Sequence, residues 1–495
     1  MGNLFAKKPL DKLMSEAQET GEHSLRRALG PLNLVTLGIG AIIGAGIFVI
    51  TGQAAAQFAG PAIILSFVLA GIACAFAGLC YSEFASMIPI AGSAYTYSYA
   101  TLGELVAWII GWDLILEYAF GAATVAVGWS GHLRAFFHDI GWNLPAMPTS
   151  DFVMFGMPIH LKYDYVGFLV ILVITTILVI GIKESANFTT AIVILKVAVV
   201  CMFIALAVAF LASHAWKPNY WHPFIPPNTG TRGEFGWSGI LRGAGVVFFA
   251  YIGFDAVSTA AQEARNPKKD MPIGILVSLV VCTILYIVVS GLLTHLVPYT
   301  QLNVPDPVVI GMRATGHPWA TFLVELGALA GLATVMLVML LGQSRVFYSM
   351  SRDGLLWSWA SKIHPHFRTP YVSSIVVGFF VAILATLIPL NVLDEMTSVG
   401  TLLAFVLVSA GVIVMRRTHP EVPRPFKTPM VPLVPILSIL FSALLIVSLS
   451  YWTQLRLLVW LVIGLAIYFT YGRKHSRVQQ MKAAVNSKSA PTMAD

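Results

Sequence analysis

The sequence predicts an all-α polytopic membrane protein with twelve transmembrane helices. Of the 495 residues, 57% are apolar and only 11% are charged, whereas about 25% of the residues in an ordinary soluble domain are charged. Twelve apolar runs recur along the chain, each long enough to cross a hydrocarbon core of roughly 30 Å as a helix. The runs do not alternate polar with apolar residues, so they predict helices rather than the strands of a barrel.

Charged residues and turn signals such as Asn266-Pro267 and Val431-Pro432 separate the runs. The centres of the runs fall near residues 45, 75, 115, 174, 200, 250, 283, 334, 381, 405, 440 and 462. We therefore expect five regions: a cytoplasmic N-terminal tail (1–33), a first group of five helices (34–213), a second group of five (237–416), helices 11 and 12 (431–471), and a cytoplasmic C-terminal tail (472–495).

The distribution of basic residues predicts the orientation. If both termini are cytoplasmic, 22 of the 30 Lys and Arg residues fall on inner segments, as the positive-inside rule requires. The net charge of +7 then reflects topology, and we expect no nucleic-acid partner. The first apolar run is too long for the core of a signal peptide. We therefore expect a multi-pass protein of the cell membrane whose first span directs insertion.

Nothing in the sequence indicates a metal, a cofactor or enzyme chemistry. The four cysteines all fall in apolar runs, and His364 and His366 form the only close histidine pair, with no third ligand near them in sequence. The chain contains neither a phosphate-binding loop nor a convincing dinucleotide fingerprint. Any coupling to nucleotide hydrolysis would therefore need another chain.

Glycine clusters interrupt the first and sixth runs, within residues 38–48 and 243–255. A single cluster of this kind is explained about equally well by close helix packing through small residues as by an interrupted helix. The second cluster, however, lies five spans after the first, and five is an odd number. The second group of five helices therefore enters the membrane from the opposite side, and the two groups can form an inverted pair. Paired broken helices in corresponding positions indicate a transporter's binding site.

The directions of the two interrupted helices predict the ligand. If span 1 unwinds near Gly44, its outer half begins with free N–H groups and a positive dipole end, which suit a carboxylate. The first half of span 6 would end near Phe248 with free carbonyl groups, which suit an ammonium group. An α-amino acid joins both charges. The expected substrate-binding residues are Ile43, Gly44, Ala45, Gly46, Phe248, Phe249, Ala250, Tyr251, Phe254, Glu117 and Met339.

Charged residues also lie within the runs. Lys196 is about nine residues into the fifth run, where a lysine costs about 2.5–3.5 kcal/mol on insertion scales. It is either a proton relay or a permanent hydrogen-bonded strut. Asp113 and Glu117 lie four residues apart on one helix face. Glu117, the deeper of the two, either takes part in proton coupling or makes a helix-packing hydrogen bond.

Several stretches of the chain together resemble a known family. They are Ile39–Phe48, Tyr81–Phe84 with Pro89–Tyr97, Gly111–Tyr118, Phe248–Asp255, Glu263–Pro267 with Pro272–Gly274, and Arg345–Gly354. The chain resembles transporters of the amino acid, polyamine and organocation (APC) superfamily, closest to bacterial homologues of the cationic amino acid transporters. The resemblance implies a five-plus-five inverted-repeat (LeuT-like) fold, alternating access, and substrate main-chain recognition by the unwound parts of spans 1 and 6.

The resemblance also implies roles for two of the buried charges. Lys196 matches a lysine whose ammonium group stands where sodium-driven relatives of the fold bind a cation. Glu117 matches a glutamate of the cationic branch that could sense substrate or pass a proton.

We therefore expect proton-coupled import of L-amino acids by alternating access. Met336 or Met339 facing the site would shorten the pocket, which favours small neutral, alanine-like substrates, with cationic amino acids as further substrates. An amino acid exchanger without net proton coupling and a sodium-coupled symporter are the alternatives. The expected partners are the amino acid, a proton and the lipid bilayer, and a monomer suffices for this mechanism.

Overall fold

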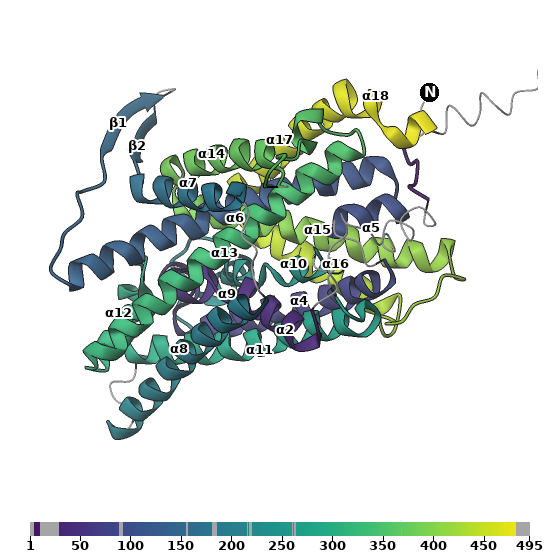
Figure 1. Ribbon diagram of the computed structural model, residues 1–495. Coiled ribbons are helices and arrows are strands. Elements are labelled where there is room, and N and C mark those ends of the chain that lie inside the picture. The colour runs from purple at the N-terminus through teal and green to yellow at the C-terminus, as the bar shows by residue number, and fades with distance from the viewer. Residues whose placement is uncertain are drawn as a thin grey trace, which may run out of the picture.

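The computed structural model describes residues 4–9, 29–88, 93–154, 157–180, 186–214, 216, 220–259, 261, 264–367 and 369–481. Long apolar helices form one bundle (Figure 1). The longer helices are α2 (Pro31–Ile42), α4 (Ile63–Met87), α5 (Ser93–Thr101), α6 (Glu104–Asp139), α7 (Tyr165–Ile180), α8 (Ala186–Ser213), α9 (Gly236–Val247), α11 (Pro267–Leu296), α12 (Pro307–Ala314), α13 (Pro318–Arg352), α14 (Tyr371–Leu387), α15 (Leu390–Thr418), α16 (Leu433–Ser448) and α17 (Tyr451–Ile467).

Short helical turns connect these helices or interrupt them. They are the π-helical turns η1 (Gly46–Ile50), η2 (Ala55–Ala59) and η8 (Tyr468–Gly472), the 3₁₀ turns η3 (Gly60–Ala62), η4 (Phe248–Tyr251), η6 (Tyr299–Gln301) and η7 (Ser358–Ser361), and the short α-helices α3 (Thr51–Ala54), α10 (Phe254–Thr259) and α18 (Arg473–His475).

The predicted helical membrane protein is confirmed. Among the described residues, seven helical stretches are long and apolar enough to cross a membrane, and α7, α14 and α16 are shorter apolar helices. One of the seven, Pro31–Met87, holds the first two predicted runs in a single stretch, because η1 to η3 continue the chain from α2 to α4. The number of membrane crossings and the inverted repeat remain predictions.

The centre of the bundle is α6, which packs against α13 and α15, while α11 packs against α2 and α4. Helices at the periphery expose large apolar side chains, for example Ile194 on α8, Leu440 on α16 and Val462 on α17. A soluble protein rarely exposes apolar surface on this scale. The outer surface of the bundle is therefore suited to lipid.

The two ends of the bundle differ. At one end, strands β1 (Thr149–Met154) and β2 (Met157–Lys162) pair antiparallel, with Thr149 opposite Lys162. This hairpin was not predicted and is a small exception to the all-α expectation. At the opposite end lie the N-terminal residues and α18 (Figure 1), and there the backbone N–H of Glu104 donates to the Ala6 carbonyl at 3.0 Å. We call these the hairpin end and the tail end.

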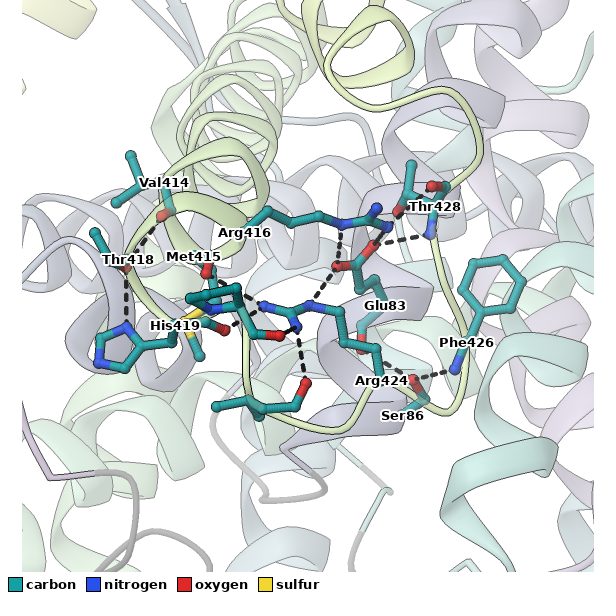
Figure 2. A network of polar contacts seen from close by, with 12 residues as sticks. Glu83, Ser86, Val414, Met415, Arg416, Thr418, His419, Arg424, Phe426 and Thr428 are labelled. Atoms are coloured by element: carbon teal, nitrogen blue, oxygen red, sulfur yellow. Dashed lines mark hydrogen bonds and ion pairs between the residues drawn. The ribbon is translucent and has the colours of Figure 1, made fainter.

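Glu83 anchors the tail end of α4 to α15 and to the loop that follows it (Figure 2). Its carboxylate accepts hydrogen bonds from Arg416 Nε at 3.0 Å and Nη2 at 2.7 Å, and from the Thr428 backbone N–H at 2.8 Å. Arg424 completes the group, with Nε 3.4 Å from Glu83 Oε1. The Nη1 and Nη2 groups of Arg424 donate to main-chain carbonyls at the end of α15 and in the loop, including that of His419 at 2.7 Å. One buried carboxylate therefore holds two arginines.

The variant Glu83→Gln is expected to destabilise the protein by about 3 kcal/mol, because it leaves two arginines without their counter-charge in a largely buried setting. A thermal unfolding measurement in detergent checks this. Glu421→Gln is the matched control, since Glu421 is exposed on the same loop. Equal melting temperatures for the two variants would show that the Glu83 network contributes little.

Asp306 precedes α12 at the hairpin end, and its backbone carbonyl accepts N–H bonds from Val309 and Ile310 at 3.0 and 3.2 Å. Burial raises the pKa of its carboxyl group above the ordinary value. The folded protein thus holds this proton more tightly than the unfolded chain does. The resulting stability is present below the unfolded pKa of about 3.9 and is lost as the pH rises through the folded pKa.

The variant Asp306→Asn has no carboxyl group to ionise, so it does not lose stability as the pH rises. Asparagine is also a residue type favoured before a helix. We expect its melting temperature to exceed that of the wild type at pH 7 and the difference to shrink toward pH 4. Melting curves across this pH range measure the effect. A gain that is the same at both pH values would contradict the assignment to this carboxyl group.

Candidate functional site

The helix that begins with α2 is interrupted in the middle of its run. α2 ends at Ile42, Ile43 is extended at φ −71° and ψ 103°, and the π-helical turn η1 begins at Gly46. A Cβ atom on Gly46 would lie 2.3 Å from Ala250 Cα, closer than any side chain tolerates. Glycine is therefore required because the main chains of two interrupted helices touch here.

The second interruption follows α9. The helix ends at Val247, the 3₁₀ turn η4 follows, and Ile252 is extended before α10 begins at Phe254. Gly253 has φ +118°, a conformation that residues with a side chain rarely adopt. A Cβ atom at Gly253 would also lie 2.8 Å from the Ala41 carbonyl oxygen. Both predicted interruptions are thus present, and they lie against each other.

Tyr286 of α11 joins the two interruptions. Its hydroxyl group lies 2.8 Å from the carbonyl oxygen of Ile42 and 2.8 Å from that of Ala250, and both are hydrogen-bond acceptors. The side chain is fully buried. Tyr286 is not among the predicted site residues; in the sequence it is a tyrosine within the apolar run centred near residue 283. A buried hydroxyl group usually has a partner, but the sequence does not identify it.

Lys196 of α8 contacts the end of α2. Its ammonium group donates to the Gly40 carbonyl at 2.9 Å and to the Ile43 carbonyl at 3.2 Å, and the residue is fully buried. The last carbonyl groups of a helix have no partner within it, so the lysine supplies donors where the interruption leaves acceptors. This geometry suits a permanent structural link between α8 and α2. It also suits a proton carrier whose charge determines how strongly the end of α2 is held.

Carboxyl groups are buried on α6 and at the start of α10. Asp113 and Glu117 are both buried. Within the described part of the chain, the two carboxyl oxygens of Asp113 have no hydrogen-bond partner, and neither does Oε1 of Glu117. At the start of α10, the Tyr118 hydroxyl donates to Asp255 Oδ2 at 3.0 Å, and the Gly253 N–H donates to Asp255 Oδ1 at 3.3 Å. Buried polar atoms without partners are rare in proteins and often mark functional sites within membranes.

Aromatic side chains pack around η4. The ring centroid of Phe405 on α15 lies 5.4 Å from that of Phe248 and 5.1 Å from that of Phe254. The Tyr251 hydroxyl donates to the Phe67 carbonyl of α4 at 2.9 Å, so this side chain is committed to α4. All these residues are buried, which leaves main-chain groups as the polar face of the turn.

Met339 of α13 lies against α6, where its sulfur is 2.9 Å from the position that a Cβ atom on Gly121 would take. Val335, one turn earlier on α13, is equally close to Gly44, at 2.8 Å from the corresponding position. α13 therefore covers both the α2 interruption and the α6 face that carries Glu117. Glu263, at the start of one of the stretches that resemble the family, lies outside the described residues.

The chain is similar to known proteins over most of its length. A family model described as amino acid permease matches residues 29–470. The chain is 47% identical to the branched-chain amino acid permease BcaP of Bacillus subtilis (strain 168) over 97% of this chain and 100% of that protein. It is 44% identical to the methylthioribose transporter of the same organism over 96% of this chain and 99% of the relative. It is 37% identical to the vacuolar cationic amino acid transporter 4 of Arabidopsis thaliana over 85% of this chain and 68% of the relative.

Proposed function

We propose, on the premise that the chain belongs to the amino acid permease family, that it imports L-amino acids across the cell membrane together with protons. It is a multi-pass membrane permease and not an enzyme. The observation that carries the proposal is the contact between two interrupted helices at Gly46 and Ala250. Interrupted helices near the bilayer midplane are where secondary transporters bind their substrates.

In this proposal the substrate's main-chain groups bind the two interruptions. The carboxylate group is held by the backbone of Ile43, Gly44, Ala45 and Gly46, and the ammonium group by the carbonyl oxygens of η4. The Ala250 carbonyl already accepts the Tyr286 hydroxyl, but a carbonyl oxygen has two lone pairs and can accept a second donor. The side chain of the substrate then lies among Phe248, Phe254 and Met339.

Lys196 couples the proton to this movement. While it is protonated, its ammonium group bonds to Gly40 and Ile43 and fixes the end of α2. Loss of the proton weakens these two hydrogen bonds, because a charged donor binds more strongly than a neutral one. The proton passes to water on the cytoplasmic side as the tail end of the bundle opens, and the end of α2 is then free to move. Glu117 is a second proton-coupling group, close to the substrate side chain.

Small neutral, alanine-like amino acids are the first substrates to test, and the names of the relatives extend the list. BcaP is a branched-chain amino acid permease and the Arabidopsis relative a cationic amino acid transporter. One relative of similar identity is a methylthioribose transporter. The substrate panel therefore contains L-alanine, L-leucine, L-arginine and methylthioribose, and stabilisation against heat by each compound ranks binding.

Uptake by proteoliposomes tests the proposal. We expect accumulation of a labelled L-amino acid when the outside is acidified, in sodium-free buffer and without substrate inside. Uptake that requires a counter-substrate inside would identify an exchanger. Uptake that follows a sodium gradient and ignores pH would identify a sodium symporter. Either result refutes proton-coupled import.

A further inference from the structure

A cavity of about 370 Å³ lies at the hairpin end of the bundle, between η2, α9 and α15. Its volume falls within the range of small-molecule sites. The lining residues include Gln53, Phe58, Glu234, Arg242, Asp394 and Glu395. Val246 also lines it, and the next residue, Val247, is the last of α9 before η4. The cavity thus lies directly beside the outer half of the interrupted helix that leads to the central site.

Arg242 is the only basic residue in this lining. Its guanidinium group lies over the Phe58 ring at 4.5 Å, and its Nη2 is 3.3 Å from Glu395 Oε1. Its Nε is buried and has no partner among the described residues. The guanidinium group carries five N–H donors, so the long contact with Glu395 leaves most of its capacity unused. A carboxylate is the group that a guanidinium binds best, through two parallel hydrogen bonds.

The three acidic residues of the cavity differ in their hydrogen-bond partners. Glu395 has a second partner, because Thr453 of α17 donates to its other carboxylate oxygen. Glu395 therefore keeps a hydrogen bond if Arg242 moves to another carboxylate. Asp394 accepts the Glu395 backbone N–H through Oδ1 at 2.6 Å, and Glu234 accepts a hydrogen bond from Thr229 at 2.8 Å. Both have oxygens left to accept the hydrogen atoms of an ammonium group.

We propose that this cavity is an outer docking site for the α-amino acid, where Arg242 binds the carboxylate group and Asp394 and Glu234 face the ammonium group. The incoming carboxylate competes with Glu395 for Arg242. The pair between Arg242 and Glu395 links α9 to α15, so docking loosens this link next to the central site. The inference rests on the proposed function and adds a first binding step to it.

Two variants separate docking from a purely structural ion pair. Both Arg242→Gln and Glu395→Gln remove the pair, so a structural role predicts that they act alike. Docking predicts opposite effects: Arg242→Gln loses the carboxylate partner, whereas Glu395→Gln removes the competitor. We expect Arg242→Gln to raise the KM for external substrate by about tenfold, the loss of one charge-assisted contact, with kcat changed by less than about twofold. We expect Glu395→Gln to lower KM.

The measurement is the initial rate of L-alanine and L-leucine uptake by proteoliposomes over a range of external concentrations. Arg232→Gln is the control, because Arg232 is exposed near the same end, and it should leave KM unchanged. Arg242→Lys keeps the charge without the paired donors, so its KM should fall between those of wild type and Arg242→Gln. It also serves as the test variant if Arg242→Gln does not fold.

The outcomes are distinct. A raised KM for the position 242 variants, together with an unchanged or lowered KM for Glu395→Gln, supports the docking site. Any other pattern in protein that transports overturns it, including equal shifts for both residues or no shift at all. Wild-type vesicles that take up neither amino acid under any gradient refute the proposed function itself.

Discussion

Replacing Lys196 with alanine is expected to abolish pH-driven accumulation of amino acids, down to the level of empty liposomes. The variant lacks the only ammonium group that bonds to the Gly40 and Ile43 carbonyls among the described residues. It therefore has no proton-dependent contact at the end of α2. Removing a buried charge relieves its desolvation cost, so the protein should still fold. The measurement is labelled uptake with an acidic outside, with melting curves to confirm folding.

Two further variants sharpen this test. Lys196→Met keeps a long unbranched side chain without the charge and should lose accumulation in the same way. Lys269→Ala, an exposed lysine at the start of α11, should transport normally. Wild-type proton-driven accumulation in Lys196→Ala would leave the lysine as a structural strut and would remove it from the coupling mechanism.

Gly46→Ala is the second variant with a large expected effect. The new Cβ atom would lie 2.3 Å from both Cα and Cβ of Ala250, so the two interrupted helices must separate. Overpacking of this kind costs about 1–3 kcal/mol. We expect a lower melting temperature, no uptake, and no stabilisation by L-amino acids, because the two halves of the substrate site no longer meet.

Gly411→Ala provides the matched control. Position 411 is also a buried helical glycine, but the new Cβ atom would lie 3.4 Å from its nearest neighbours, an ordinary contact. It should fold and transport like the wild type. If Gly46→Ala bound and transported amino acids normally, the contact between the interruptions would not be part of the site.

Much of the fold could be predicted from the sequence because lipid imposes simple rules. Apolar runs of sufficient length predict helices, and the structure has a helical segment at each predicted run. The interruptions near Gly44 and Phe248 were also predictable, since glycine clusters within an apolar run weaken the helix there. Lys196 stood out because a lysine in such a run is costly and needs partners.

Other features depend on which helices meet in space, which one sequence does not reveal. Tyr286 is distant in sequence from both Ile42 and Ala250, so no local signal indicates that its hydroxyl group lies between their carbonyl oxygens. Asp255 accepts hydrogen bonds from Tyr118 and from the Gly253 N–H beside the second interruption, and the first of these partners is on another helix. The cavity at Arg242 likewise arises from three separate segments. The β1–β2 hairpin lies in a loop that hydropathy does not describe.

The most direct test of the central claim is a structure determined with a bound L-amino acid. We expect ligand density between η4 and the Ile43–Gly46 segment, with the ammonium group against η4 carbonyls and the carboxylate against the backbone of the other segment. Ligand density elsewhere in the bundle, or continuous α-helix through both segments in the occupied protein, would contradict it.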